Sequence, residues 1–285
     1  MNGSIPSFLL GFILPQELFF SRIPIDFQYG LEPKKEHPMK IAVAGKGGVG
    51  KTTLTVWLGD YLARENKDVW LVDADTTQSL GPALGLAEEE LPAPLVNQQE
   101  LIQERVGSGG FINMNPKVDD LLESLSLEVR GMHLMLMGTV AGAGSGCGCA
   151  PNTLLKATLA HLIVWRAQRV LVDLEAGVEH LGRGTIGSVD GLVVVSEPSI
   201  RGLQTASRIS TMARDLGLKR QALVLNRAAE NFEPPGNMEL PPLAARIPFL
   251  QSLEDRQQQS SSVLDLPERD QIDELCRKVL AAFEE

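Results

Sequence analysis

The stretch Gly45-Lys46-Gly47-Gly48-Val49-Gly50-Lys51-Thr52-Thr53 decides the fold of this chain. A glycine, four residues and then Gly-Lys-Thr is typical of a loop that wraps backbone N–H groups around a polyphosphate, because glycine adopts the positive φ angles that turn successive amides inward. An apolar run at 40–44 precedes the loop and a helix-like run at 54–58 comes after it. The stretch therefore predicts a nucleotide-binding loop with the positive end of a helix dipole under the phosphates.

The motif assigns chemistry to two of its side chains. Lys51 is expected to reach the β- and γ-phosphates, and the Thr52 hydroxyl is expected to hold Mg²⁺. The alternative is a glycine-rich turn that binds nothing, which the complete strand–loop–helix context disfavours. All nine residues from Gly45 to Thr53 are accordingly predicted to bind ATP.

Composition limits the classes of protein to which the chain can belong. Its 285 residues, 44% of them hydrophobic, are enough for one large α/β core, and no internal repeat is visible. A net charge of −10 argues against a nucleic-acid-binding surface, which needs clustered Lys and Arg. Three cysteines do not make a disulfide framework, so we expect a reducing, cytoplasmic location.

The first 38 residues differ in composition from the rest of the chain. They hold five of the nine phenylalanines, whereas the predicted nucleotide-binding core opens abruptly at Met39. The apolar stretch 8–14 has no basic segment before it and is too short to span a bilayer. We expect residues 1–38 to be a poorly ordered extension or the product of an upstream start codon, with an amphiphilic anchor as the alternative. Residues 39–285 are predicted to form a single ATPase domain.

Short apolar runs alternate with helix-length segments along this domain. After 40–44, the runs that read as buried strands are 69–73, 133–137, 169–173, 191–196 and 221–226. This alternation predicts an α/β fold, a doubly wound and mostly parallel sheet flanked by helices, with the nucleotide at the carboxyl edge. Two runs end in acids there: Asp73, closely followed by Asp75, and Asp173, which is a candidate to hold Mg²⁺ through water or to cap a helix.

The last helix bears on membranes and on the third cysteine. Apolar residues recur at helical spacing from Ile272 to Phe283, which places Cys276 on the buried face as a core thiol. The polar face lacks the basic character of a membrane-surface helix, so no stable membrane insertion is expected.

Cys147-Gly148-Cys149 is the second informative motif. Two thiolates separated by one glycine can face one soft metal ion, and one chain supplies half of a four-sulfur shell. A two-fold mate could supply the other half, because an isologous interface brings identical residues together. A tight turn with idle thiols and a local disulfide are the alternatives, and a lone histidine such as His161 or His180 could add a ligand.

Residues 46–53 resemble the deviant phosphate loop of the MinD/ParA/nitrogenase iron protein superfamily, a group of P-loop NTPases. The resemblance implies an ATP-bound homodimer in which Lys46 reaches the phosphates of the other subunit. It also implies that Asp75 orients the attacking water and that Asn226 recognises the adenine edge. The family pattern differs at Thr76 and Ser79, where proline and asparagine are usual, which puts the mobility of this first switch segment in doubt.

Several motifs together resemble the nickel-inserting ATPases of the CooC type, which mature carbon monoxide dehydrogenase and have close relatives acting on acetyl-CoA synthase. They are the phosphate loop with Lys46, the cysteine pair, Asn115 to Asp120, Asp173 to Arg183, and Ser196 to Ser199. The resemblance covers most of residues 39–285. It implies ATP and Mg²⁺ as cofactors, nickel at Cys147 and Cys149 with zinc possible there, and a nickel enzyme as the client.

Two other classes stay open. A redox ATPase resembling nitrogenase iron protein could also draw four cysteines from two subunits, although there the two ligands of one chain lie far apart in sequence. A positioning ATPase of the MinD/ParA kind would bind vesicles or DNA when ATP is added, which the acidic composition disfavours.

Overall fold

The computed structural model describes residues 38–75, 77–107, 113–118, 120–138, 153–154, 157–158, 169–174 and 189–284. The predictions that fall on residues 1–37, Thr76, Asp119, the 139–152 segment with its cysteine pair and the 175–188 segment lie outside these ranges. From residue 38 onward the described parts belong to one compact unit, Glu36–Glu285.

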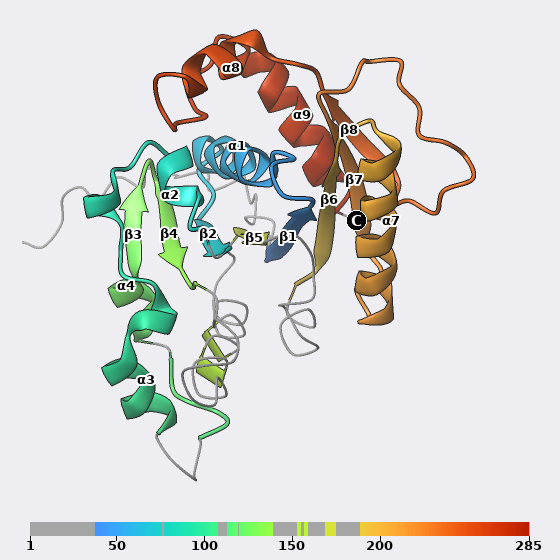
Figure 1. Cartoon of the computed structure of the whole chain (residues 1–285). Coiled ribbons are helices and arrows are strands. Elements are labelled where there is room, and N and C mark those ends of the chain that lie inside the picture. The colour runs from blue at the N-terminus through green and yellow to red at the C-terminus, as the bar shows by residue number, and fades with distance from the viewer. Residues whose placement is uncertain are drawn as a thin grey trace, which may run out of the picture. The chain divides into compact units, whose positions relative to one another are not determined.

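A single twisted sheet forms the centre of this unit (Figure 1). Its strands are β1 Met39–Gly45, β2 Val69–Ala74, β3 Ser126–Val129, β4 Met132–Leu136, β5 Arg169–Leu174, β6 Gly191–Ser196, β7 Gln221–Asn226 and β8 Leu243–Ile247. They lie in the order β3-β4-β2-β5-β1-β6-β7-β8. All neighbours are parallel except β3 and β4, which confirms the predicted doubly wound, mostly parallel sheet.

Helices cover both faces of the sheet, as Figure 1 shows. The α-helices are α1 Lys51–Arg64, α2 Leu80–Ala83, α3 Gln99–Val106, α4 Leu121–Leu125, α7 Ile200–Asp215, α8 Gln251–Gln257 and α9 Arg269–Ala281, and two short 3₁₀ turns are η1 Glu88–Glu90 and η2 Leu95–Asn97. Alternate residues of β1 explain the two layers: Ile41 and Val43 pack towards α1 and α9, and Ala42 and Ala44 pack towards α7. A strand buried on both faces reads as a continuous apolar run, which is why β1 was visible in the sequence.

The strand order fixes where the loops meet. β1 lies between β5 and β6, and β2 lies on the other side of β5. Because these strands are parallel, the loops that leave the carboxyl ends of β1, β2, β5, β6 and β7 emerge at one edge of the sheet, where ligands bind in open α/β folds. Among the described residues, no helix is both long and apolar enough to cross a membrane.

The Cys276 thiol lies in the core, as the helical spacing predicted. It is fully buried on the sheet-facing side of α9, and this burial raises the pKa of the thiol far above its ordinary value. A thiol held neutral in this way is a small hydrophobic group rather than a metal ligand.

We expect Cys276→Ser to lower the free energy of unfolding by about 1–3 kcal/mol, because the substitution buries a hydroxyl among apolar side chains. Urea unfolding of the variant beside Cys276→Ala, which removes the sulfur and adds no polar atom, measures this. A serine variant as stable as the parent protein would contradict the apolar setting of this position.

Candidate functional site

The predicted phosphate loop joins β1 to α1 as the sequence required. The carbonyl of Lys46 accepts from the N–H of Val49 at 3.3 Å, and the Gly50 carbonyl accepts from the N–H of Leu54 at 3.0 Å, as the first turn of α1 begins. Gly50 has φ 99°, and a Cβ there would lie 2.4 Å from Nδ2 of Asn226. Glycine is needed at this position both for the backbone conformation and for the approach of β7.

The two lysines of the loop lie in different surroundings. Lys51 is 6% exposed, and its Nζ lies 3.5 Å from the Lys46 carbonyl oxygen, under the loop. The side chain of Lys46 is exposed. Lys51 is therefore placed to meet phosphates held by its own loop, whereas Lys46 is directed to solvent.

Thr52 and Asp173 meet across the sheet edge. The Thr52 hydroxyl donates to Oδ2 of Asp173 at 2.6 Å, and Oδ1 of the same carboxylate is buried without a hydrogen-bond partner in the described residues. Burial raises the pKa of Asp173 to about 7; the Thr52 hydrogen bond and the Lys51 charge oppose that rise. A hydroxyl beside a buried carboxylate with an unused oxygen is the hard oxygen donor set that Mg²⁺ prefers, so these residues fit that ion.

Asp73 fixes the chain that leads to Asp75. Its Oδ1 accepts the N–H of Asp75 at 3.0 Å, and its Oδ2 accepts the N–H of Leu80 at 2.9 Å. The second bond caps α2, because the preceding residue, Ser79, makes no side-chain cap of its own. Burial raises the pKa of Asp73 to about 6, whereas the two amides favour its charged form. The sequence singled Asp73 out as a strand-end acid but did not reveal this clamp.

Asp75 itself is 7% exposed and lies at the start of the clamped segment. Its Oδ1 accepts both the backbone N–H and the hydroxyl of Thr77, each at 2.9 Å. The Thr77 hydroxyl also lies 3.1 Å from the hydroxyl of Ser79, one of the two positions that depart from the family pattern. The serine therefore belongs to a short hydrogen-bonded turn around Asp75.

Asn226 ends β7 beside the loop. Its Nδ2 donates to the Val49 carbonyl at 2.7 Å, and its Oδ1 accepts the N–H of Arg227 at 2.9 Å. A carboxamide has two N–H donors and two acceptor lone pairs, so one donor and one acceptor remain for a ligand. A cavity of about 100 Å³ opens next to this amide and to Gly48, Gly50 and Thr53.

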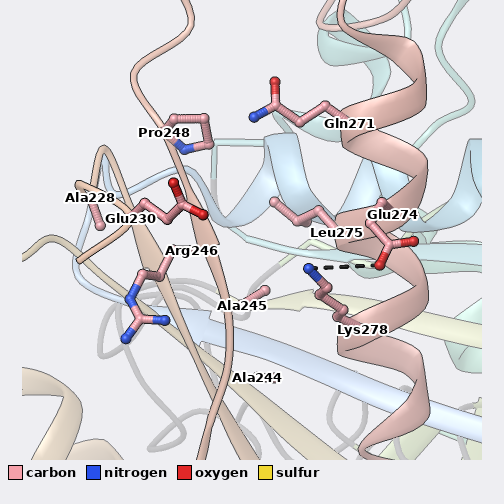
Figure 2. Close-up of a pocket in the computed structure, with 10 residues that line it drawn as sticks. All are labelled: Ala228, Glu230, Ala244, Ala245, Arg246, Pro248, Gln271, Glu274, Leu275 and Lys278. Atoms are coloured by element: carbon pink, nitrogen blue, oxygen red, sulfur yellow. Dashed lines mark ion pairs between the residues drawn. The ribbon is translucent and has the colours of Figure 1, made fainter. Parts of the chain in front are cut away.

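A larger cavity of about 420 Å³ lies elsewhere. Figure 2 shows it between β8, α9 and the chain after β7, with the Lys278–Glu274 ion pair on its helical wall and the Arg246 side chain on its opposite side. No residue of the phosphate loop lines it. Size alone would select this cavity, whereas the residues predicted to bind the nucleotide, Gly48, Gly50, Thr53 and Asn226, line the smaller one.

The remaining predicted site residues, Cys147 and Cys149, lie outside the described residues. Within the described ranges, no three His, Cys, Asp or Glu side chains are grouped so as to hold a metal ion. The predicted residues that the structure does bring to one edge of the sheet are the phosphate loop, Asp73, Asp75, Asp173 and Asn226.

Comparisons with known proteins identify the family to which the chain belongs. Residues 40–265 match the model of the CobQ/CobB/MinD/ParA nucleotide binding domain. The carbon monoxide dehydrogenase accessory protein CooC of Rhodospirillum rubrum is 45% identical over 197 residues, which are 67% of this chain and 75% of that protein. An uncharacterized ATP-binding protein of Methanocaldococcus jannaschii is 40% identical over 194 residues, 66% of this chain and 75% of that protein.

Solved structures show the same fold at low sequence identity. MinD in the MinC:MinD complex of Aquifex aeolicus matches with a TM-score of 0.62 at 21% identity, over 85% of this chain and 96% of that one. MinD of Pyrococcus horikoshii, complexed with Mg-ADP, matches with a TM-score of 0.57 at 20% identity, over 87% and 99%. The chain belongs to the CobQ/CobB/MinD/ParA nucleotide-binding family, it is an ATPase, and its resemblance to the CooC type is confirmed.

We expect Asp73→Asn to lower kcat for ATP hydrolysis roughly tenfold to a hundredfold, with KM for ATP changed less than about threefold. The carboxamide of the substituted residue would turn its N–H₂ group towards one of the two backbone N–H groups that Asp73 accepts. Two donors cannot hydrogen-bond each other, so the Asp75 segment would shift while the phosphate loop stays intact. Steady-state kinetics of Asp73→Asn, measured beside Asp75→Asn for comparison, separate the effect on kcat from the effect on KM. A rise in KM with kcat unchanged would show that Asp73 serves binding instead.

The raised pKa of Asp173 predicts a pH dependence for Mg²⁺·ATP binding. Below pH 7 this carboxyl is mostly protonated, and the ion requires it charged, so affinity is expected to rise by up to about tenfold per pH unit between pH 6 and 7 and to level off above. Asp173→Asn is the control: its nucleotide titrates as in the parent protein, but it lacks the titrating carboxyl. If the two proteins have parallel pH profiles, the carboxyl does not contribute.

Proposed function

We propose that this member of the CobQ/CobB/MinD/ParA family is a CooC-like maturation ATPase that couples ATP hydrolysis to the insertion of nickel into carbon monoxide dehydrogenase or acetyl-CoA synthase. The observation that carries the proposal is the 45% identity to the Rhodospirillum rubrum accessory protein CooC, in a chain whose sequence also has Lys46 in its phosphate loop and the Cys147-Gly148-Cys149 pair. Nickel is the cargo of this reaction, and a nickel enzyme is the client.

The proposed reaction centre uses the residues gathered at the carboxyl edge. Lys51 neutralises phosphate charge from its own subunit, and Lys46 does so across the two-fold axis of a homodimer. Thr52 holds Mg²⁺, with Asp173 behind it binding the ion through water; the bound ion supplies charge stabilisation for the phosphates. Asp75, held by the Asp73 clamp, orients the attacking water.

Asn226 is the proposed reader of the base. Its one remaining donor and one remaining acceptor match the adenine edge, which offers an N–H₂ donor beside a ring-nitrogen acceptor. Guanine presents two acceptors at the equivalent edge and matches this pair less well. The amide therefore favours ATP over GTP.

The proposed nickel site is shared between subunits. Cys147 and Cys149 from each chain supply four thiolates, a soft donor set that also suits zinc. If ATP closes the dimer, it assembles this set, and by linkage nickel and ATP then change each other's affinity. Hydrolysis relaxes the dimer and releases the metal to the client.

The remaining parts of the proposal concern the chain as a whole. Residues 39–285 act as one ATPase domain with a metal-binding loop, residues 1–38 take no part in catalysis, and the protein works in the cytoplasm. The acidic net charge of −10 supports the absence of a nucleic-acid partner.

Nickel titration of the reduced, metal-free protein with and without ATP tests the proposal, with dimer mass followed in parallel. We expect one nickel per dimer, loss of binding in Cys147→Ser/Cys149→Ser, and retention in Cys276→Ala, which changes the buried third cysteine. Lys46→Ala keeps the cysteines but is expected to lose ATP-dependent dimerisation and to lower kcat on the order of 10³-fold, as for a cation supplied in trans.

Two outcomes would contradict the proposal. Nickel binding that persists in the double cysteine variant removes the thiolate site. Nickel affinity and dimer mass that ATP leaves unchanged remove the coupling, and vesicle binding on ATP addition would then favour a positioning ATPase. A brown chromophore after anaerobic purification would favour the iron–sulfur alternative.

A further inference from the structure

Phe249 is an exposed aromatic side chain outside the phosphate loop and its cluster of acids. Three large hydrophobic side chains are exposed in the described residues, namely Met114, Ile200 and Phe249. Phe249 is 56% exposed and lines the small cavity beside the phosphate loop, which neither of the other two does. Exposed apolar surface beside a binding loop is more informative than the same surface elsewhere.

The cavity has two unlike sides. The phosphate loop and the Asn226 amide form one side. The chain after β8 forms the other, with the Phe249 ring, Leu250 and, from α8, Leu253. The lining therefore combines backbone and amide polarity with an aromatic side chain and leucines, which is the combination that small-molecule sites use to orient a flat heterocycle.

The helix α8 lies on the surface of the domain and contributes no buried residue to its core. None of its seven residues is buried, yet Leu253, Glu254 and Gln257 line the cavity. Glu254 lies 3.9 Å from the guanidinium of Arg227, whose other partner is Glu197 at 3.6 Å. Exposed ion pairs of this length contribute little to the stability of α8 on the domain. A ligand buried against Phe249 and Leu253 would stabilise this position of α8 more than these ion pairs do.

A nucleotide held by the loop has limited room for its base. Its phosphates occupy the N–H groups before α1, and the described cavity next to Gly48, Gly50 and Thr53 leads from them to Asn226. Pro248, the residue before Phe249, lines both this cavity and the larger one, but no residue of the phosphate loop lines the larger one. Asn226 and Phe249 both line this cavity, so a base that enters it would meet the amide and the aromatic side chain.

We propose that Phe249 is a specificity-determining residue of the ATPase, the stacking wall for the purine base, and that α8 completes the base and ribose side of the site. The inference rests on the part of the proposed function that assigns the base to Asn226, and it is independent of nickel. Stacking acts on the base alone, so it should affect nucleotides and leave ligands without a base unaffected.

Phe249→Ala is expected to raise KM for ATP about tenfold while kcat stays within about twofold, as for loss of one base-stacking contact. The inhibition constant of inorganic tripolyphosphate, which has no base, is expected to stay unchanged. Ile200→Ala is the matched control, since its side chain is equally exposed at 56% and lies outside the cavity. Phe249→Tyr keeps the ring and is expected to keep the parental KM.

Phe249→Trp gives a direct readout that does not depend on turnover. Its added fluorescence is expected to be quenched by ATP and not by tripolyphosphate, after subtraction of the parent protein, which has its own tryptophan, Trp57, at this cavity. An unchanged KM in Phe249→Ala, or equal weakening of ATP and tripolyphosphate, would overturn the inference. Such a result in a protein that still hydrolyses ATP leaves the proposed function standing, whereas failure of the parent protein to bind ATP would refute both.

Discussion

The register between β1, β5 and β2 is the constraint on which the site depends. Val43 is level with Asp173, and Asp73 is level with the same Asp173 across the next pair of strands. Because the strands are parallel, this pairing places Asp73 and Asp173 side by side, next to the phosphate loop that follows β1. A slip of one residue would turn a carboxylate to the opposite face of the sheet and separate it from Thr52.

This register has an electrostatic cost that explains the chemistry of the site. Asp73 and Asp173 are both fully buried, and burial is the main reason that the pKa of each is raised. The structure offsets this cost unequally. Asp73 receives two backbone N–H groups, whereas Asp173 receives one hydroxyl and, among the described residues, keeps one oxygen without a partner. The better-satisfied acid therefore serves the architecture of the loop, and the other has an oxygen available to a divalent cation and its water.

The parts of the fold that the sequence predicted are those that local pattern determines. The central strands are buried on both faces, so they appear as continuous apolar runs, and α9 shows the helical spacing that placed Cys276 in the core. β8 was missed because Leu243–Ile247 includes two alanines and an arginine and comes after a proline-rich loop, so its strand character depends on pairing with β7. The wall formed by Phe249 and α8 was missed for a similar reason: α8 buries no residue and has no apolar stripe to predict its place.

Tertiary contacts on either side of the loop also determine how the site would respond to a bound nucleotide. Asp73 binds the two ends of the 75–80 segment, so anything that moves Asp75 also strains the cap of α2. On the other side, Asn226 links the loop carbonyl of Val49 to the backbone of Arg227, whose side chain lies near acids from two other segments. Triphosphate and base would thus be sensed by separate contacts on opposite sides of one loop. A nucleotide that satisfied only one set would leave the other set in its unliganded arrangement. If ATP closes a dimer as proposed, such a partial ligand would therefore not complete the closure.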